Sequence, residues 1–474
     1  MAKRIKADIC VIGAGSGGLS VAAGAVQMGA RTVLIERDAM GGDCLNTGCV
    51  PSKALLAAAK QAYGMGEGEP FGIAPAKAKV DFAKVQDHVH GVIAAIAPND
   101  SVARFEALGV TVIKDHARFR DGGTVIAGNA EISARRFVVA TGSRAAVPPI
   151  PGLDKVPFYT NENLFENREC PRHLIIVGGG PIGMEMAQAH RRLGARVTVL
   201  EGLRAFNRDD PELSAIVIDR LRREGIEILE GVKVASVSGE AGRISVEIDD
   251  KGEKRTVEGS HILIATGRRA NVEGLDLEKA GIEYSDRGLK VDDRLRTTNK
   301  HVFGVGDVAG GLQFTHVAGY HAGIVIRNAL FRVPARADHS AVPWVTFTDP
   351  ELAHVGETEV SARDRNMKIN VLRWHLAEND RAQAERQTEG VIKVVTDTHA
   401  RVLGATIVGP HAGELILPWV LAKSQALKLS AMASVIAPYP TLSEISKRVA
   451  GSYYTPTLFS PKTRMLVRFL GLFG

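Results

Sequence analysis

Apolar residues along the chain gather in short runs that end in glycine. Residues 7–12 form such a run, followed by the turn GAGSGG (13–18), an apolar stretch to about residue 28, and a second apolar run over 32–35 that ends at Glu36. Short, almost continuous apolar runs are typical of parallel strands buried on both faces. The pattern predicts a strand, a glycine turn, a helix and a second strand.

The same unit occurs again further along the chain. An apolar run over 173–177 precedes the turn GGGPIG (178–183), a helical stretch to about residue 193, and a strand over 196–200 that ends at Glu201. In both copies the acidic residue follows the first glycine by 23 positions. A lone glycine turn is weak evidence, but two copies in the same context indicate two dinucleotide-binding units.

Each glycine of such a turn has a physical task. One permits the tight turn, one lets the backbone approach a diphosphate, and one lets the helix pack on the strand. The diphosphate lies at the helix N-terminus, and the acidic residue, Glu36 or Glu201, accepts hydrogen bonds from ribose hydroxyls. The candidate glycines are Gly13, Gly15, Gly18, Gly178, Gly180 and Gly183.

Three later apolar runs extend the two units. FVVATG (137–142) and ILIATG (262–267) each read as a buried strand that ends in Ala-Thr-Gly, which makes Thr141, Gly142 and Gly267 candidate binding residues. VFGVGD (302–307) reads as another short strand, and its end places Gly306 and Asp307 where ligands bind an open sheet. We expect two full nucleotide-binding domains with inserted hairpins.

The chain changes character after about residue 340. Strands are predicted over 351–356, 391–396 and 402–408, and helices over 413–427 and 444–452, without a nucleotide-binding fingerprint. The predicted fold class is α/β, with two Rossmann-like dinucleotide-binding domains and a C-terminal α+β interface domain. A length of 474 residues fits about three domains.

Composition excludes several classes of protein. The hydrophobic share of 45% and the charged share of 24% are ordinary for soluble globular proteins. The net charge of +6 comes from a mixed surface, so we expect no nucleic-acid partner. No apolar run is long enough for a secretory signal or a membrane span, which predicts a cytoplasmic protein.

The stretch GGDCLNTGCVPSK (41–53) carries the candidate chemistry. Pro51 suits the first helical position, so Cys49 is expected at the N-terminus of a helix that runs to about residue 63. A thiolate is stabilised there by the helix dipole. Lys53 lies one turn later on the same face, where its ammonium can stabilise a thiolate and pair with Glu185. Two close thiols, Cys44 and Cys49, indicate redox chemistry.

Half of a zinc site is the alternative for such a pair. Zinc needs two more cysteine or histidine ligands at suitable spacing, and Cys10 and Cys170 have no such companions. We therefore expect no resident metal. Cys10 lies in an apolar strand and reads as a buried structural thiol.

These features together resemble the class I pyridine nucleotide-disulfide oxidoreductases, the family of dihydrolipoamide dehydrogenase, glutathione reductase and mercuric reductase. The resemblance rests on the thiol stretch, both glycine turns, both Ala-Thr-Gly ends, Gly306-Asp307 and the segment PTLSE (440–444). It implies an FAD domain over 1–150, an NAD(P) domain over 151–270, a central region over 271–340 that completes the FAD site, and a dimerisation domain over 341–474. A homodimer is expected.

The resemblance also implies residue roles. Cys49 becomes the flavin-facing charge-transfer thiol and Cys44 the interchange thiol that attacks the acceptor, while Lys53, paired with Glu185, lies near flavin N5. Glu36 binds the FAD ribose and Asp307 the ribityl chain. Gly178, Gly180 and Gly183 hold the NAD(P) pyrophosphate, with Gly267 nearby. Glu201 favours NADH over NADPH, although Arg204 and Arg208 soften that preference.

The chain departs from the family near its C-terminus. Members that reduce organic disulfides carry His-Pro there, with the imidazole held by a downstream Glu; this chain has Tyr439-Pro440 and Glu444. A phenol is a poor base at neutral pH, so weak disulfide reductase activity is expected. Mercuric reductase is similar in having tyrosine there, yet its C-terminal cysteine pair is missing from this sequence.

Several acceptors and one non-enzymatic role stay open. The electrons pass to a disulfide or soft acceptor, with Hg or Cu reduction and quinone reduction as alternatives; a redox-sensing interaction protein is the non-enzyme alternative. The C-terminal residues interleave Lys462, Arg464 and Arg468 with apolar residues. That pattern suits weak contact with a membrane surface, whereas packing of the apolar side chains on the dimer is the favoured explanation.

Overall fold

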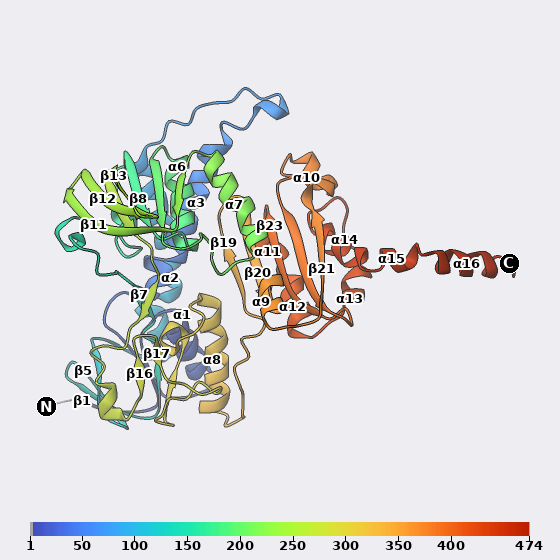
Figure 1. The fold of residues 1–474 in the computed structure, drawn as a ribbon. Coiled ribbons are helices and arrows are strands. Elements are labelled where there is room, and N and C mark those ends of the chain that lie inside the picture. Colours follow the sequence, from blue (N-terminus) through green and yellow to red (C-terminus); the bar gives the residue numbers. More distant parts are fainter. Residues whose placement is uncertain (1–2, 474) are drawn as a thin grey trace. The chain divides into compact units, whose positions relative to one another are not determined.

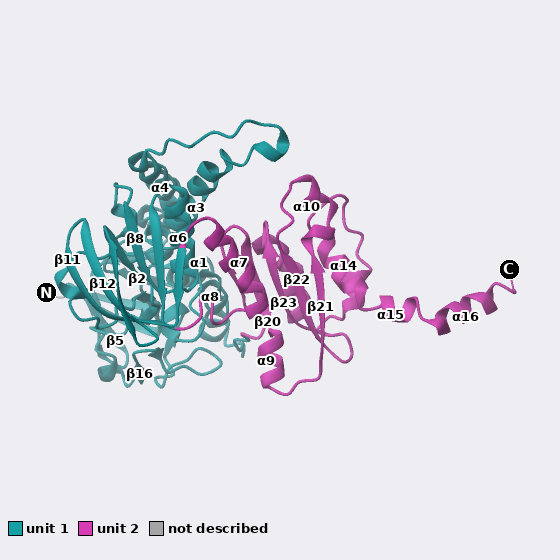
Figure 2. Cartoon of the chain, turned by 45° about the horizontal axis from the view of Figure 1, so that its top comes forward, with its two compact units in different colours: residues 1–202, 227–338 teal, residues 203–226, 339–474 magenta. Residues whose placement is uncertain are grey.

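The computed structural model describes residues 3–473. They fall into two compact units, shown in separate colours in Figure 2. Unit 1 comprises the residues up to Gly202 together with Glu227–Asp338, and unit 2 comprises Leu203–Ile226 together with the residues from His339 onward. Segment 203–226 belongs to the expected NAD(P) domain but groups with the C-terminal part, and the four-part division expected from sequence stays a prediction.

The first glycine turn belongs to a seven-stranded sheet in unit 1. Six strands follow the order β3-β2-β1-β6-β5-β4, and β18 pairs with the last residues of β6. Strands β1 and β5 of this sheet are labelled in Figure 1. Strands β1, β2, β3, β6 and β18 pair in parallel, while β4 and β5 form the expected hairpin. The strands are β1 Lys3–Ile12, β2 Thr32–Glu36, β3 Thr111–Lys114, β4 Ala117–Asp121, β5 Thr124–Ala127, β6 Ala130–Val139 and β18 Val302–Gly304.

The second glycine turn belongs to a parallel sheet of order β10-β9-β8-β14. Its inserted segment is a three-stranded antiparallel sheet, β11-β12-β13, where a hairpin was expected. The predicted strand-turn-helix-strand unit is therefore confirmed in both copies. The strands are β8 His173–Val177, β9 Arg196–Glu201, β10 Glu227–Glu230, β11 Val232–Glu240, β12 Arg243–Asp250, β13 Glu253–Gly259 and β14 His261–Ile264.

Helices pack on the first sheet through small residues. A Cβ atom at Gly17 would lie 3.3 Å from Ala318 Cβ, and one at Gly24 would lie 2.3 Å from Ile326 Cδ1, both in α8. Because both positions lack a side chain, α1 and α8 pack closely. The segment around residues 302–329 thus returns to the first sheet. The unit 1 helices are α1 Ser16–Gln27, α2 Gly42–Asn46, α3 Cys49–Gly64, α4 Phe82–Ile96, α5 Val102–Ala107, α6 Pro181–Arg192 and α8 Thr315–Ala329.

Two short strands join the nucleotide-binding halves of unit 1. Strand β7 (Ser143–Ala145) follows the first Ala-Thr-Gly segment and β15 (Arg268–Ala270) follows the second, and they pair antiparallel. Thr141 Oγ1 donates to the carbonyl of Asn271 at 2.7 Å, and Thr266 Oγ1 donates to the carbonyl of Ala146 at 2.7 Å. The two segments that looked alike in sequence are therefore locked together in space. Unit 1 also has the small hairpin β16 Tyr284–Ser285 and β17 Gly288–Leu289.

Unit 2 is built on an antiparallel sheet of order β19-β20-β23-β22-β21. Helix α7 (Pro211–Arg223) packs against β20 and β23. The helical stretch predicted over 413–427 is present as two helices, α11 (Ala412–Leu415) and α12 (Leu417–Ser424), since Pro418 has no backbone N–H to continue the first turn. The strands are β19 Pro343–Thr346, β20 Glu351–Gly356, β21 Ile369–His375, β22 Val391–Asp397 and β23 Val402–Gly409.

The remaining helices of unit 2 are short. They are α9 Glu359–Asp364, α10 Asp380–Ala384, α11 Ala412–Leu415, α12 Leu417–Ser424, α13 Leu429–Ala433, α14 Glu444–Ser452, α15 Thr455–Leu458 and α16 Pro461–Leu470. Across residues 3–473, none of the helices combines the length and the apolar character needed to cross a membrane.

Candidate functional site

The two glycine turns have matching geometry. Gly13 has φ +102° and Gly178 has φ +117°, and a Cβ atom at either would lie 2.4 Å from a backbone carbonyl oxygen. A Cβ at Gly18 would lie 1.8 Å from the Gly13 oxygen, and one at Gly183 would lie 2.0 Å from the Gly178 oxygen. The first and last glycines of each turn are therefore required by close backbone contacts, as the fingerprint predicts.

The middle glycines leave two helix N-termini open. Gly15 caps α1 and Gly180 caps α6, neither with a side-chain hydrogen bond nor with an acidic residue in the first turn. A Cβ at Gly180 would meet nothing within 4 Å, and one at Gly15 would meet only Gly42 Cα at 3.9 Å. The N–H groups and dipole of each helix therefore face space in which a diphosphate fits.

The acidic residue of each unit binds back to its own glycine turn. Glu36 Oε2 accepts a hydrogen bond from Ala14 N at 2.6 Å, and Glu201 Oε2 accepts one from Gly179 N at 2.6 Å. The two carboxylates thus hold equivalent places at the strand ends. These turns, helix ends and carboxylates fit two dinucleotides, one in each half of unit 1.

The two candidate redox thiols lie on consecutive helices. Cys44 lies in α2, and Cys49 is the first residue of α3. The helix begins two residues earlier than expected, which places Pro51 at its third position rather than its first, still within the turn whose N–H groups lack intrahelical partners. Both cysteines are free thiols in this structure.

The surroundings separate the acidities of the two thiols. A hydrogen bond with Cys44, then the Thr315 hydroxyl and the Lys53 charge, lower the pKa of Cys49 to about 6 against desolvation and the Asp43 carboxylate. The same Cys49 thiolate, together with burial, raises the pKa of Cys44. At neutral pH the reduced pair therefore holds one thiolate, at Cys49, and one thiol, at Cys44.

The expected ion pair between α3 and α6 is present. Lys53 Nζ lies 2.8 Å from Glu185 Oε2, and the Glu185 side chain is only 5% exposed. A buried carboxylate needs such a partner, so the pair fixes Lys53 beside the Cys49 helix turn. Its place relative to a flavin stays a prediction.

Asp307 lies where the third predicted strand ends. Burial raises the pKa of its carboxyl group, against a hydrogen bond from Ser143 and the charge of Arg268. Ser143 Oγ donates to Asp307 Oδ2 at 2.5 Å. Gly306 has φ +71°, and a Cβ there would lie 3.0 Å from Ala318 Cβ, so glycine is required before this aspartate. A buried carboxylate at a sheet end suits hydroxyl ligands.

Sequence reasoning missed three residues near the thiols. Thr315 Oγ1 lies 3.5 Å from Cys49 Sγ, and Asp43 Oδ2 lies 3.1 Å from Arg268 Nη2. Thr315 is 266 positions from Cys49. Asp43 is adjacent to Cys44, and Arg268 directly follows Gly267. For these two residues, the neighbouring motif was the only sequence signal that could have identified them.

Tyr439 and Glu444 lie in unit 2. The Tyr439 side chain is exposed and its hydroxyl donates to Asp380 Oδ2 at 3.0 Å, whereas Glu444 was the expected partner. The hydrogen bond to Asp380 raises the pKa of Tyr439 above its usual value near 10. The phenol therefore stays protonated at neutral pH, and a protonated phenol is a poor base.

One of the arginines expected to soften the coenzyme preference is already engaged. Arg204 donates to Ser214 Oγ at 2.8 Å and to the carbonyls of Phe206 and Asp209 at 3.2 and 3.1 Å. Its guanidinium thus holds the loop before α7. Arg208 is exposed.

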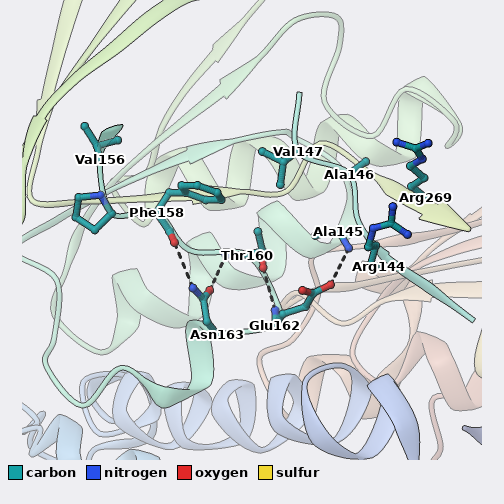
Figure 3. Close-up of a pocket in the computed structure, with 11 residues that line it drawn as sticks. Arg144, Ala145, Ala146, Val147, Val156, Phe158, Thr160, Glu162, Asn163 and Arg269 are labelled. Atoms are coloured by element: carbon teal, nitrogen blue, oxygen red, sulfur yellow. Dashed lines mark hydrogen bonds between the residues drawn. The ribbon is translucent and has the colours of Figure 1, made fainter. Parts of the chain in front are cut away.

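A cavity of about 700 Å³ lies beside strands β7 and β15 (Figure 3). Glu162 crosses it to accept a hydrogen bond from Ala145 N at 3.1 Å, and Asn163 Oδ1 accepts one from Thr160 N at 2.8 Å. Its arginines, Arg144 and Arg269, both pair with Glu273. None of the predicted site residues is among those that line this cavity.

The fold and the site define a class: a two-nucleotide flavoprotein with a dithiol pair. Residues 7–322 match the family model described as pyridine nucleotide-disulphide oxidoreductase, and residues 342–450 match its dimerisation domain. The chain belongs to this family. It is therefore an FAD-dependent enzyme that uses NAD(P)H, and the dimerisation domain supports the expected homodimer.

The chain is similar to mercuric reductases, dihydrolipoyl dehydrogenases and a flavoprotein disulfide reductase. The chain is 35% identical to a mercuric reductase of Bacillus cereus, over 92% of this chain and 70% of the relative. It is 32% identical to a dihydrolipoyl dehydrogenase of Geobacillus stearothermophilus, over 94% and 96%. The Cu(II) complex of RclA, a HOCl-induced flavoprotein disulfide reductase of Escherichia coli, has a TM-score of 0.85 at 29% identity and covers 94% of this chain and 99% of its own.

Proposed function

We propose that the chain reduces a soft metal ion, such as Cu(II) or Hg(II), with electrons from NAD(P)H, and that organic disulfides are weaker acceptors. The observation that carries the proposal is the reduced thiol pair, with a thiolate at Cys49 and a thiol at Cys44 beside it. Soft cations prefer thiolate ligands. The names of the mercuric reductase relatives and of the Cu(II) complex lend support by likeness.

The residues divide the work as follows. When bound, FAD would supply hydride acceptance from the nicotinamide and two-electron transfer to the Cys44–Cys49 disulfide, and Glu36 and Asp307 would hold its ribose and its ribityl chain. Lys53 and Thr315 stabilise the resulting Cys49 thiolate, and Cys44 engages the acceptor. Two thiolates bind a metal ion, and re-forming the disulfide returns two electrons, which reduce one Hg(II) or two Cu(II). The thiol proton of Cys44 leaves to solvent.

The chemistry of Tyr439 favours metal over disulfide. Thiol–disulfide exchange releases a thiolate that a nearby acid must protonate and a base must later deprotonate. The raised pKa of Tyr439 makes its phenol a poor partner for both steps at neutral pH. A metal ion that binds both sulfurs displaces the Cys44 proton to solvent, so its reduction requires no side-chain acid or base at Tyr439.

An acceptor series on the holoenzyme tests this proposal. Oxidised lipoamide, oxidised glutathione, a quinone, Cu(II) and Hg(II) are each supplied with NADH, and NADH oxidation is followed for the wild type and Cys44→Ala. The proposal predicts that the metals turn over faster than the disulfides and that Cys44→Ala abolishes this turnover. Unchanged turnover in Cys44→Ala would instead identify a flavin-only oxidase or quinone reductase, and failure with every acceptor would favour an interaction protein.

NADH is the coenzyme that the site residues favour. Glu201 accepts a hydrogen bond from Gly179 N, so its carboxylate is held at the end of β9, where it repels a 2′-phosphate. Arg204, which could attract that phosphate, is held by three hydrogen bonds. A comparison of kcat/KM for NADH and NADPH should favour NADH, and a preference for NADPH would contradict this assignment.

A second proposed property is contact of the basic tail, residues 461–473, with an anionic membrane surface. Seven apolar side chains of this tail are more than half exposed: Met465, Leu466, Val467, Phe469, Leu470, Leu472 and Phe473. Lys462, Arg464 and Arg468 accompany them, and the tail has no acidic residue. Each basic residue contributes about 1 kcal/mol near an anionic surface. The tail also follows the matched dimerisation domain, which ends at residue 450.

Vesicle sedimentation tests the tail. We expect the full chain to sediment with phosphatidylglycerol vesicles and not with phosphatidylcholine vesicles, and truncation after Ser460 to abolish binding. If truncation instead dissociates a dimer and leaves sedimentation unchanged, the tail packs on a second copy. A cytoplasmic location stays a prediction.

A further inference from the structure

Arg268 lies between two carboxylates that belong to different parts of the site. Its side chain is 13% exposed, and its Nη2 lies 3.1 Å from Asp43 Oδ2. Its Nε donates to Ser143 Oγ at 2.7 Å and lies 3.8 Å from Asp307 Oδ2. Asp43 directly precedes Cys44, whereas Asp307 is the carboxylate expected on the ribityl chain. The guanidinium of Arg268 is therefore close to both carboxylates, Asp43 and Asp307.

The connection to Asp307 runs through a hydroxyl. Arg268 Nε–H donates to Ser143 Oγ, and the Ser143 hydroxyl donates in turn to Asp307 Oδ2 at 2.5 Å. Arg268 Nη2 also donates to the Ser143 carbonyl at 3.0 Å. Strand pairing between β7 and β15 places both residues at this point. The relay has a fixed direction, since Asp307 can only accept while it is ionised.

The connection to Asp43 reaches the thiol pair. Asp43 Oδ1 accepts from Thr47 Oγ1 at 2.8 Å and from Asn161 Nδ2 at 2.9 Å, while Oδ2 faces Arg268. Gly48 has no side chain, and a Cβ there would lie 2.9 Å from Asp43 Oδ2. The carboxylate is therefore held close to the turn between Cys44 and Cys49, where its negative charge opposes a thiolate.

The positive charge of Arg268 offsets the negative charges of Asp43 and Asp307. Asp43 raises the pKa of Cys49, and Asp43 also raises the pKa of Asp307. A single cation between the two carboxylates reduces both effects, because opposite charges at 3–4 Å interact strongly in a partly buried site. The planar guanidinium reaches Ser143 and Asp43 at once, which the single ammonium of lysine does not.

We propose that Arg268 is a positioning residue that holds Asp43 and Asp307 in register and so couples the flavin-binding carboxylate to the Cys44–Cys49 pair. This inference rests on the proposed function, because it places the ribityl chain of FAD at Asp307. Arg268 also follows Gly267 directly. The residue therefore connects the second Ala-Thr-Gly turn with the thiol helices.

The variants Arg268→Met, Arg268→Lys, Asp43→Asn and the double variant Arg268→Met/Asp43→Asn test this coupling. Arg269→Met is the matched control, because Arg269 is the exposed neighbour of Arg268 and pairs with Glu273 instead of Asp43. Two quantities are measured: the dissociation constant of FAD, and the pH at which thiolate-to-flavin charge-transfer absorbance of the two-electron-reduced holoenzyme appears. Neither depends on the acceptor.

We expect Arg268→Met to raise the midpoint of that absorbance by about one pH unit and to weaken FAD binding roughly tenfold. Adding Asp43→Asn should return the midpoint toward the wild-type value, while FAD binding stays weak because Asp307 is still unneutralised. Arg268→Lys should recover part of both effects, and Arg269→Met should change neither.

A wild-type midpoint in Arg268→Met, or a shift that Asp43→Asn does not relieve, would overturn the inference. If Arg268→Met does not fold, Asp43→Asn alone decides: the inference predicts a lower midpoint, and an unchanged midpoint contradicts it. Absence of charge-transfer absorbance in the wild type would instead count against the proposed dithiol function.

Discussion

Cys49 combines three local influences that act in the same direction. It begins α3, it faces the Thr315 hydroxyl at 3.5 Å, and it lies one turn before Lys53. The hydrogen bond with Cys44, the largest influence, together with the Thr315 hydroxyl and the Lys53 charge outweighs desolvation and lowers the pKa of the Cys49 thiol to about 6. A reactive thiolate therefore exists at neutral pH.

The acidity of Cys49 predicts a pH dependence. Because the folded-state pKa is lowered, the thiolate is present above about pH 6 and is lost as the pH falls through that value. Charge-transfer absorbance of the reduced holoenzyme should follow this transition. Thr315→Val removes a hydroxyl that stabilises the thiolate, so its midpoint should move to higher pH; a midpoint equal to that of the wild type would show that Thr315 has no such effect.

Tyr439 gives a second prediction at this scale. Tyr439→Phe removes the hydroxyl that donates to Asp380, and we expect metal-dependent NADH oxidation to stay within about twofold of the wild type, since no proton is handled there. Tyr439→His supplies an imidazole and should raise the turnover of lipoamide. Loss of metal turnover in Tyr439→Phe would contradict the proposed acceptor.

Only site residues that lie close together in the sequence could be predicted to lie close together in the structure. Cys44, Cys49 and Lys53 lie within ten positions, and a helical repeat relates the last two, so the sequence was sufficient. Arg268 and Thr315 lie more than 200 positions from the thiols. Arg268 follows a predicted strand end, and no element was predicted at Thr315. Their contacts depend on how β15 and α8 pack, which periodicity does not specify.

The glycine turns are where individual elements can be tested. Gly183→Ala places a Cβ 2.0 Å from the Gly178 oxygen, whereas Gly180→Ala meets no protein atom within 4 Å. We expect Gly183→Ala to lower the free energy of unfolding by about 1–3 kcal/mol through overpacking. Gly180→Ala should leave stability unchanged and weaken NADH binding about tenfold, because its methyl occupies the diphosphate space.

Thermal unfolding and an NADH titration separate the two glycine variants. FAD binding is the control, since both substitutions lie in the second turn and should leave the first unaffected. Equal stability of the two variants would contradict the packing argument. Unchanged NADH affinity in Gly180→Ala would show that the diphosphate lies elsewhere.

Helices and strands with a strong apolar periodicity could be predicted from the sequence, whereas an interruption within a helical stretch could not. Strands β8 and β20 and helix α14 have the predicted bounds, since each is a clear apolar or amphipathic run. The split at Pro418 was missed because the apolar pattern continues across it. Helix α7 was not predicted from the sequence; its apolar face, with Leu213, Val217 and Leu221 buried, packs on the sheet of unit 2.

At the scale of a whole unit, a buried charge network holds α7 on its sheet. Lys393, 5% exposed, lies 2.8 Å from Asp210 Oδ2, 2.8 Å from Glu212 Oε2 and 2.9 Å from Glu359 Oε2. Asp210 is fully buried at the N-terminus of α7. Removal of the lysine leaves that carboxylate without its cation, a change that costs about 3–5 kcal/mol in buried pairs.

Lys393→Met should therefore destabilise unit 2 by an amount in that range. All three tryptophans, Trp344, Trp374 and Trp419, lie in unit 2, so urea unfolding followed by tryptophan fluorescence reports on it alone. The exposed Lys368→Met is the control and should stay within about 0.5 kcal/mol of the wild type. Equal midpoints for the two variants would show that the network does not stabilise this unit.

The proposed function of the whole molecule requires that electrons from the nicotinamide reach Cys44 and Cys49. The most direct measurement adds one equivalent of NADH to oxidised, FAD-loaded enzyme without oxygen, alkylates the free thiols, and identifies them by mass spectrometry. If the proposed electron transfer is right, Cys44 and Cys49 are both alkylated only after NADH has been added, while the alkylation of Cys10 and Cys170 does not change. Reduction of the flavin with no new thiol at Cys44 and Cys49 would contradict it.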